Sequence, residues 1–510
     1  MPGAPTLRVL FFVDRPGVLR QFSVVLQELA ARGHEVRVAL RDEPDAHRRR
    51  AVEAIVGTSP NLSYGLAPRR DPQDGWTPVA WVVRALGDLA RYTHPRYAAA
   101  PVLRARMTKK TLGRLRSRQL LDPVGQALAL KLGERLAATS DAGLSERTIR
   151  RAARLEAAIP PSEEITRAIR EQQPDVVLVT SVVKSASAQV EYLKSARAAG
   201  VPSGSCVASW DNLTNKGLLK FVPERVFVWN EVMRREAVEL HGIPRERVVA
   251  TGAALFDPWF GRQPSGPRET FVRAASLDPD RPYVLFLGSS PFVTHHGEVE
   301  VRFVERWIDA LRASGDERVR GIGVMVRPHP IGKGWKGADL ARFGNAVIWP
   351  PHSERPIAAQ DQADFFDSLA HSAVVVGINT TAMIEAAIAG KSVLTVLAPE
   401  FAQETTLHFH YLLEENGGFL HVASSLEEHA AQLGRVLDED AADAERRLRF
   451  VESFVRPHGL DRAAAPVFAD AVEELAAVPV QGAPSAGLLL RAPLALEAAL
   501  LRRVRRDADE

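Results

Sequence analysis

The stretch VVVGINTTAMIEAAIAGKSVL, residues 374–394, joins a buried strand to a helix and then to a second strand. Its opening valines have the continuous apolar character of a strand covered on both faces, and Gly377 ends that run. Small hydrogen-bonding residues then open the helix, namely Asn379, Thr380 and Thr381. A strand, a helix and a strand joined by short connections form a parallel βαβ unit. The stretch therefore predicts an α/β domain.

The same alternation of strand and helix runs through most of the chain, and 510 residues are too many for one compact core. We therefore predict an α/β protein with two Rossmann-like parallel-sheet domains. The polar segment 263–282, rich in proline and glycine, predicts a linker between them. The predicted N-terminal domain is 1–262, the C-terminal domain is 283–460, and 461–510 are C-terminal helices.

A helical insertion is predicted at about 80–154 in the N-terminal domain. Residues 91–121 within it carry nine Lys or Arg and no acid, with leucines at roughly helical spacing. This pattern is typical of basic amphipathic helices and suits peripheral contact with an anionic membrane. The same basic residues could instead pair with acids elsewhere in the fold or bind a polyanionic polymer.

The composition is typical of a soluble globular protein, with 46% hydrophobic and 25% charged residues. A formal net charge of only +3 does not indicate nucleic-acid binding. The single cysteine, Cys206, excludes a disulfide framework and fits a reducing cytosol. The first residues lack the pattern of a secretory signal, and the apolar tract near residue 490 is broken by charges. We expect a cytoplasmic protein, or one peripheral at the inner membrane face.

The helix that follows Gly377 is a candidate phosphate site. The first N–H groups of a helix lack partners within it, and the helix dipole makes that end partly positive. Asn379, Thr380 and Thr381 are also ordinary capping residues, so a plain cap is the alternative. Glu385 favours a nucleotide, because it lies one turn after Thr381 on the same helix face and suits a pair of ribose hydroxyls.

Two more loops are predicted at the carboxyl ends of strands in the same domain. RPHP, residues 327–330, places Arg327 and His329 on a rigid turn that could hold a diphosphate, or else forms a surface turn. FLGSSPF follows the first strand of this domain with three small residues that let a backbone approach a ligand, Gly288, Ser289 and Ser290.

In the N-terminal domain, SWDNLTNKG (209–217) crowds polar and aromatic side chains into one loop. It predicts an acceptor-binding surface formed by Trp210, Asn212 and Lys216, with Asp211 as a candidate acid or base. The alternative is a structural loop with a buried tryptophan.

Together these residues resemble the GT-B class of nucleotide-sugar glycosyltransferases, in particular the branch of CDP-glycerol glycerophosphotransferases and bacterial capsule-polymer transferases. Segments 225–257, 327–330 and 374–394 carry the resemblance. It implies two domains facing a cleft, with the nucleotide donor bound by the C-terminal one. Carried over by residue, it implies that His329, Thr380 and Thr381 bind the diphosphate and that Glu385 binds the ribose.

One departure from this branch bears on the donor. Its capsule and polyol-phosphate members often carry a serine pair where this chain has Asn379, Thr380 and Thr381, so a CDP- or CMP-linked donor does not follow. The epimerases that share the architecture have an acidic, arginine-bearing helix motif that is not matched here.

The resulting prediction is a glycosyltransferase that needs neither metal nor other cofactor. It would move a sugar from a nucleotide-sugar to a hydroxyl of a cell-envelope glycan or lipid-linked acceptor, with no nucleic-acid partner. Asp211 and Asp14 are the candidate catalytic bases. Two alternatives remain: a glycerophosphotransferase or UDP-sugar 2-epimerase on the same fold, and a non-catalytic module of a polysaccharide assembly complex.

Overall fold

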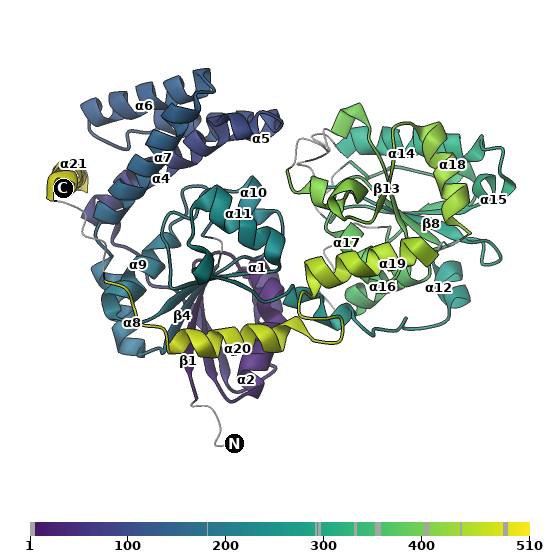
Figure 1. Ribbon diagram of the computed structural model, residues 1–510, viewed down its shortest axis with the longest axis horizontal. Helices are drawn as coiled ribbons and strands as arrows, with labels where there is room; N and C mark the ends of the chain where they lie inside the picture. Colours follow the sequence, from purple (N-terminus) through teal and green to yellow (C-terminus); the bar gives the residue numbers. More distant parts are fainter. Residues whose placement is uncertain are drawn as a thin grey trace. The chain divides into compact units, whose positions relative to one another are not determined.

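The chain folds into two compact units, each built on one parallel sheet (Figure 1). The computed structural model describes residues 6–180, 182–290, 293, 297–330, 334–351, 359–401, 407–438, 441–482 and 488–509. The first unit comprises Met1–Asp257 and Arg456–Glu510, and the second comprises Pro258–Val455. The predicted α/β class with two Rossmann-like sheets is therefore confirmed.

The first unit holds a seven-stranded sheet in the order β3-β2-β1-β4-β5-β6-β7. Its strands are β1 Arg8–Val13, β2 Glu35–Leu40, β3 Leu62–Leu66, β4 Val176–Thr180, β5 Ser203–Cys206, β6 Arg225–Val228 and β7 Val248–Ala250. The main helices around the sheet are α1 Pro16–Leu19, α2 Ser23–Ala31, α3 Ala46–Val56, α8 Glu163–Gln172, α9 Val190–Ala199, α10 Asn212–Asn215 and α11 Glu231–His241. The chain leaves β1 toward β2 and returns to β4 on the other side, so the strand order reverses between β1 and β4.

The predicted insertion consists of four helices, α4 Trp76–Thr93, α5 Pro101–Ser117, α6 Pro123–Ala138 and α7 Ala142–Ala158. It is therefore longer at both ends than the expected 80–154. Helix α5 has the exposed basic character that the sequence predicts for residues 91–121. Helix α4 is buried on nearly every side, including its charged residues Arg84, Asp88 and Arg91.

Buried ion pairs fasten α4 to its neighbours. Arg84 donates to both carboxylate oxygens of Glu156 on α7 (2.7 and 2.8 Å) and to Glu191 on α9. Lys194 of α9 also reaches Glu156 (3.0 Å). Charges buried this deeply are stable only when they are paired in this way, so the network holds the insertion in a defined position on the sheet unit.

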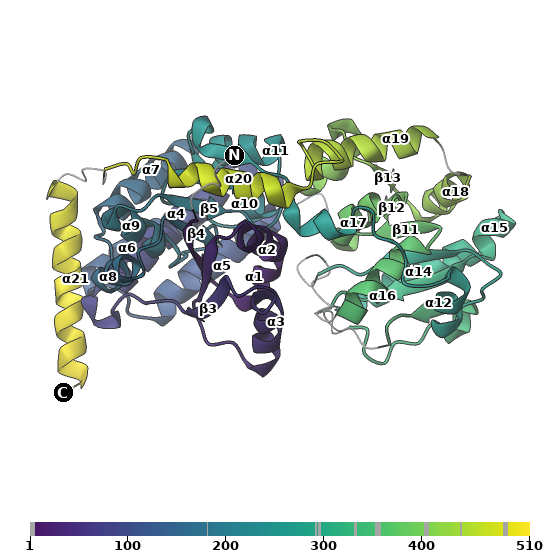
Figure 2. The same cartoon turned by 90° about the horizontal axis from the view of Figure 1, so that it is seen from below.

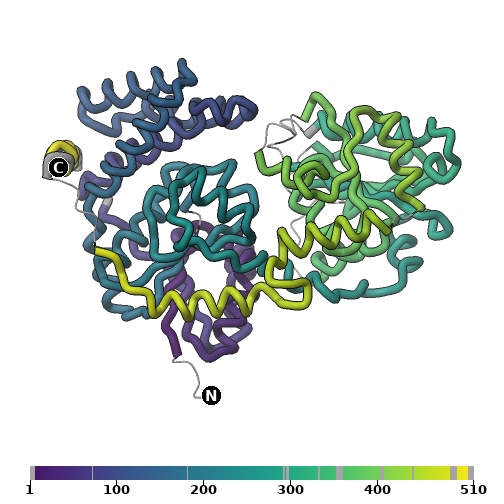
Figure 3. The backbone as a smooth tube through the Cα atoms, in the orientation of Figure 1, coloured from purple at the N-terminus to yellow at the C-terminus, as the bar shows by residue number. Residues whose placement is uncertain are grey.

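The C-terminal segment belongs to the first unit, which the sequence does not predict. Helix α20, Ala464–Ala476, runs beside α2 (Figure 3). Its side chains Phe468, Val472 and Leu475 lie in the core of that unit. Helix α21, Leu488–Asp509, lies against α4 and α7 (Figure 2). Among the residues that the structure describes, no helix is long and apolar enough to cross a membrane.

The second unit holds a six-stranded sheet in the order β10-β9-β8-β11-β12-β13. Its strands are β8 Tyr283–Leu287, β9 Gly323–Arg327, β10 Ala346–Ile348, β11 Val374–Gly377, β12 Val393–Val396 and β13 Leu420–Ala423. Its main helices are α12 Arg268–Ala274, α14 Gly297–Arg312, α15 Glu317–Arg320, α16 Ala359–Ala370, α17 Ala382–Ile388, α18 Leu426–Val436 and α19 Ala441–Phe450. Here the order reverses between β8 and β11.

The segment 263–282, expected to be a linker, is instead folded into the second unit. It contains α12, and the Ser265 N–H donates to Asp367 on α16 (3.0 Å). Its proline and glycine content reflects the turns on either side of a short helix rather than a free connection.

Candidate functional site

The carboxyl ends of β8, β9 and β11 meet at the point where the strand order of the second sheet reverses. Parallel α/β sheets bind ligands in the crevice outside this point, because the connections on its two sides diverge there. We call the residues that follow these three strands the donor edge: Gly288–Ser290, Pro328–Pro330 and Ile378–Thr381. All of them come from loops that the sequence singles out.

Gly288 brings two of these loops into direct contact. Its N–H donates to the Arg327 carbonyl (2.9 Å), and a Cβ at this position would lie 2.6 Å from the backbone nitrogen of His329. Backbone atoms at that distance cannot be displaced without moving the loop. The glycine is therefore required by the close approach of the loop that carries His329.

Ser289 connects the loop after β8 to the loop after β11. It is 1% exposed, and the Asn379 N–H donates to its hydroxyl oxygen (3.4 Å). Ser290, the next residue, is half-buried. Candidate residues from distant parts of the sequence are thus brought together on both sides of the reversal point.

Glu300 on α14 also belongs to this arrangement, and the sequence reasoning missed it. One of its carboxylate oxygens accepts the Ser289 N–H (2.7 Å) and the other accepts the indole N–H of Trp335 (2.9 Å). Burial raises the pKa of Glu300 to about 7, although both hydrogen bonds favour the charged form. The sequence did contain a signal for Glu300. It lies on the same helix face as the apolar residues Phe303, Val304 and Trp307, and an acid on such a face normally points into a core.

The helix after β11 begins slightly later than the sequence predicts. Helix α17 starts at Ala382, so Asn379, Thr380 and Thr381 form the turn before it rather than its first turn. The Thr380 hydroxyl accepts the Ala382 N–H (3.5 Å), and Asn379 is 6% exposed. Glu385 lies half-buried in the first turn of α17, so the expected spacing from this turn is kept.

Arg327 is held away from a simple phosphate-binding role. Its guanidinium donates to Asp364 on α16 (2.7 Å) and lies 5.1 Å from the centre of the Phe365 ring. The indole N–H of Trp349 donates to the same carboxylate (2.9 Å). The charge of Arg327 is thus already balanced, and its contacts fix the end of β9 from which the loop of His329 begins.

In the first unit, Asp14 follows β1 at the corresponding reversal point and is 2% exposed. It accepts hydrogen bonds from Lys184 (2.8 Å), after β4, and from Arg41 (3.0 Å), after β2. Burial raises the pKa of Asp14, but these two cations outweigh burial and hold the pKa below its ordinary value. A carboxylate with a lowered pKa is a weak proton acceptor.

The loop 209–217 divides its candidates between surface and core. Asp211 is partly exposed, accepts from the side-chain amide of Asn212 (2.9 Å) and lies 3.8 Å from the exposed Lys216. Trp210 is 2% exposed and ranks among the largest buried side chains, which leaves little of its ring to stack on an acceptor. The loop thus has the polar surface expected of an acceptor site, but its tryptophan is buried, as expected of a structural loop.

A buried acid on α4, missed by the sequence reasoning, organises this loop. Asp88 is 0% exposed, accepts the N–H groups of Ala186 and Leu218 (2.8 and 2.7 Å) and pairs with Lys220 (2.8 Å). A Cβ on Gly217 would lie 2.6 Å from its carboxylate. The insertion therefore determines the course of two loops at the carboxyl edge of the first sheet.

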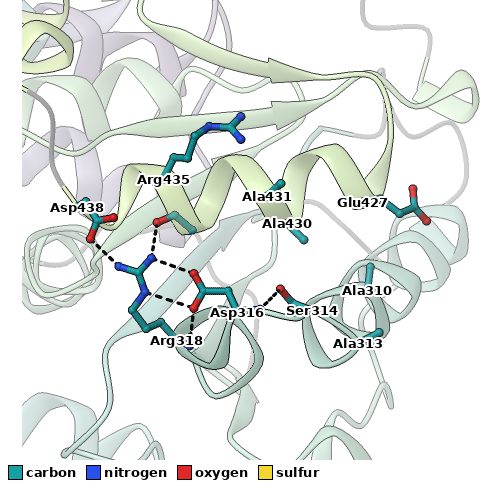
Figure 4. A pocket seen from close by; sticks show the side chains of 11 residues that line it. Ala310, Ala313, Ser314, Asp316, Arg318, Glu427, Ala430, Ala431, Arg435 and Asp438 are labelled. Atoms are coloured by element: carbon teal, nitrogen blue, oxygen red, sulfur yellow. Dashed lines mark hydrogen bonds and ion pairs between the residues drawn. The ribbon is translucent and has the colours of Figure 1, made fainter.

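A hollow of about 480 Å³ lies elsewhere on the second unit, between α14, α15 and α18 (Figure 4). Its lining includes an ion-paired cluster of Arg318 with Asp316 and Asp438. The C-terminal end of α14, helix α15 and one face of α18 line it. Helix α15 lies between α14 and β9, where the chain reaches the amino edge of the parallel sheet before the next strand begins. It is thus separate from the donor edge.

Comparison with known proteins gives the fold a name. A glycosyltransferase from Rickettsia africae ESF-5 matches with a TM-score of 0.50 and 10% identity, over 92% of this chain and 98% of that one. UDP-GlcNAc 2-epimerase from Neisseria meningitidis matches with a TM-score of 0.47 and 12% identity, over 92% of this chain and 100% of that one. WaaG, a glycosyltransferase involved in lipopolysaccharide biosynthesis, matches with a TM-score of 0.45 and 13% identity, over the same shares of the two chains. No protein-family model matches, and no curated protein matches by sequence. The two units have the GT-B fold, and at these identities the likeness extends to the fold alone.

Proposed function

We propose that this protein is a glycosyltransferase that moves a sugar from a nucleotide-diphosphate sugar to an acceptor hydroxyl. The observation that carries the proposal is the convergence of three loops at the reversal point of the second sheet, where Gly288 meets the backbone of His329 and Ser289 meets Asn379. A glycine and hydroxyl-bearing residues at such a point suit a phosphorylated ligand, since backbone N–H groups and hydroxyls can surround its oxygens.

The donor would lie with its diphosphate at the donor edge. Thr380, Thr381 and Ser290 would donate hydroxyl hydrogen bonds, and His329 would stabilise the charge that develops on the leaving diphosphate. Arg327 would fix the end of β9 rather than bind the diphosphate, because Asp364 already balances its charge. Glu385 would accept hydrogen bonds from the ribose hydroxyls. No step in this scheme requires a metal ion.

The acceptor would bind to the first unit, with Asp211 as the base that takes the proton from its hydroxyl. The acceptor oxygen then forms a bond to the anomeric carbon, and the bond from that carbon to the diphosphate breaks, which releases the nucleoside diphosphate. Asp211 is favoured over Asp14, because Lys184 and Arg41 lower the pKa of Asp14. A cell-envelope glycan or lipid-linked acceptor fits the accessible basic residues of α5.

A nucleotide panel tests the proposal. UDP, GDP, CDP, CMP and dTDP are added separately to the full chain, and the melting temperature is measured, since a ligand that binds the native state raises it. A nucleoside diphosphate should give a clear shift, and the matching nucleotide-sugar should release that diphosphate equally well with magnesium or with excess EDTA.

The same panel separates the alternatives. A response to CMP alone, with release of CMP from a CDP-linked donor, would indicate a glycerophosphotransferase. Interconversion of a UDP-sugar without any acceptor would indicate an epimerase. No shift with any nucleotide would contradict the proposal and favour a non-catalytic module. Turnover that is lost in EDTA and restored by magnesium would contradict metal independence.

A further inference from the structure

Two exposed cations frame the carboxyl edge of the first sheet. Lys184 and Arg41 share the carboxylate of Asp14 and keep 37% and 40% of their side chains exposed, while Asp14 is 2% exposed. Arg41 also lies 4.0 Å from the exposed carboxylate of Asp42, which Arg69 already pairs at 2.7 Å, so exposed cations still outnumber exposed carboxylates on the side that a ligand would meet. This is the point of the first sheet where the strand order reverses, which is the preferred ligand position in such folds.

Helix α5 adds two more cations to the same place. The Arg106 guanidinium donates to the carbonyl of Asn215 (3.0 Å), so α5 lies against the loop that contains Asp211. Lys110, one turn further along, is exposed. The loop that Arg106 contacts also reaches the segment of Lys184, because the Gly217 N–H donates to the carbonyl of Val183 (2.5 Å). In the part of the chain that the structure describes, no carboxylate forms an ion pair with Lys110.

Positive charge therefore exceeds negative charge at this edge. Asp88 is already paired with Lys220 (2.8 Å), and Asp14 is shared by three cations, Arg15, Arg41 and Lys184. Partial burial lowers the pKa of Lys110, Asp88 raises it, and Lys184, Arg106 and Lys220 lower it further. Like charges held this close oppose folding unless a counter-charge is present, so a bound anion would relieve the repulsion.

We infer that this basic edge, formed by Lys110, Lys184, Arg106 and Arg41, binds a phosphate group carried by the acceptor. The inference rests on the proposed function and names the chemical class of its acceptor. Arginine forks and lysine ammonium groups are the side chains that suit phosphate oxygens. The contact between Arg106 and Asn215 places the phosphate site beside the loop of Asp211, the proposed base.

The remaining basic residues of α5 favour a local site over a flat membrane contact. Arg104 donates to Ser140 and to the carbonyls of residues 137 and 139, within the insertion. Arg116 pairs with Glu134 (2.8 Å), and Arg114 lies 4.3 Å from the centre of the Trp81 ring. These cations are engaged by the insertion itself, so the unbalanced charge gathers at one end of the first sheet rather than along the whole helix.

Competitive lysine acetylation, read by mass spectrometry on the full chain, tests the inference. The reactivities of Lys110, Lys184 and Lys109 are compared in potassium phosphate, in glycerol 3-phosphate and in potassium chloride of equal ionic strength. Lys109 is the matched control, because it is adjacent to Lys110 on α5 and exposed. Both phosphates should protect Lys110 and Lys184 and leave Lys109 unchanged.

Affinity for phosphate, measured by calorimetry, gives the second readout. Lys110→Ala should weaken phosphate binding about tenfold, as expected for one lost charge-assisted hydrogen bond, and Lys109→Ala should not change it. Equal effects of the two variants, or no protection by either phosphate, would overturn the inference. Protection of Lys109 and Lys110 alike by vesicles of phosphatidylglycerol, without protection by soluble phosphate, would replace it with a membrane surface. Nucleotide binding by the same samples would show separately whether the proposed function stands.

Discussion

The two units share one topology but differ in how several of their most deeply buried ionisable groups are satisfied. In the first unit these groups are paired: Arg84 with Glu156 and Glu191, and Asp88 with Lys220. In the second unit, Glu300 on α14 has only N–H donors around its carboxylate, and His429 on α18 has no hydrogen-bond partner among the described residues. These groups of the first unit therefore keep their charges in pairs, whereas burial favours the neutral forms of Glu300 and His429.

This difference bears on how the loops at the carboxyl edges of the two sheets are held in place. Ion pairs hold the loops of the first unit against the insertion and leave surplus positive charge at its surface. The second unit holds its loops through backbone contacts and hydroxyls, with Gly288 and Ser289 at their meeting point. Charge pairs position loops at a cost in desolvation, whereas close backbone packing positions them through shape. The same sheet reversal thus supports two kinds of binding surface.

The largest effect is expected from breaking a buried pair in the first unit. Asp88→Ala should lower the free energy of unfolding of that unit by about 3–5 kcal/mol, because Lys220 and two backbone N–H groups lose their partner. Urea denaturation followed by circular dichroism measures this loss. Asp42→Ala, which removes an exposed carboxylate, should change stability little. Similar losses in the two variants would show that the buried network is not what holds the insertion.

Glu300 should make the second unit less stable as pH rises. The pKa of its carboxyl is about 7 in the folded state against an ordinary 4.5, so the folded protein binds the proton more tightly. Its contribution is fully present below pH 4.5 and is lost as pH rises toward 7, by about 3 kcal/mol in total. Glu300→Gln should remove this contribution, so the stability of the variant relative to the native protein should rise by about 3 kcal/mol between pH 4.5 and 7 in denaturation curves. Glu298→Gln, on the exposed side of α14, is the control and should leave the curve unchanged.

His429 should act in the opposite direction over nearly the same range. Burial lowers the pKa of His429 to about 4 from 6.5, so the unfolded chain binds the proton more tightly and stability is lost as pH falls from 6.5 toward 4. His429→Leu should remove this loss and add about 1 kcal/mol at neutral pH, because two buried nitrogens without partners disappear. The native pH profile should therefore be flatter than that of either single variant. A steeper native profile would mean that the two groups do not titrate as their burial requires.

A smaller effect is expected from the turn before α17. Thr381→Ala should weaken nucleotide binding by about 1–2 kcal/mol with little change in the melting temperature, as for a lost hydrogen bond to a charged group. Glu385→Gln should weaken binding of nucleotides that contain ribose and should not affect inorganic diphosphate. Calorimetry with each ligand checks both variants. Unchanged nucleotide affinity in both would remove this turn from the donor site.

Much of the second unit could be predicted from the sequence, because the residues that define its strands and loops are close together in the chain. The apolar strands and the small residues after them lie next to one another in the chain, as in residues 374–394. The helix was predicted to open with Asn379, Thr380 and Thr381 but begins at Ala382, since a turn and the first turn of a helix contain the same residue types. The donor-edge residues accordingly come together as strand topology requires.

The first unit was harder to predict because its decisive partners are distant in the chain. Asp88 interacts with residues about a hundred positions away, and no local pattern identifies an acid on an apolar helix as one half of a pair. The amphipathic pattern of α20 shows that one face is apolar, but not that this face covers α2. For the same reason the segment 263–282 was misread as a linker, since turn-rich composition does not report which unit the turns join.

The nucleotide affinity of two glycine-to-alanine variants tests the central claim most directly. Gly288→Ala would force a Cβ to within 2.6 Å of the His329 backbone, whereas Gly315→Ala, in the same unit, meets nothing within 4 Å. Calorimetry with the nucleoside diphosphate that stabilises the wild type should show binding weakened at least about tenfold by Gly288→Ala and unchanged by Gly315→Ala, with both variants folded. Equal affinity in wild type and Gly288→Ala would contradict the assignment of the donor site to this edge.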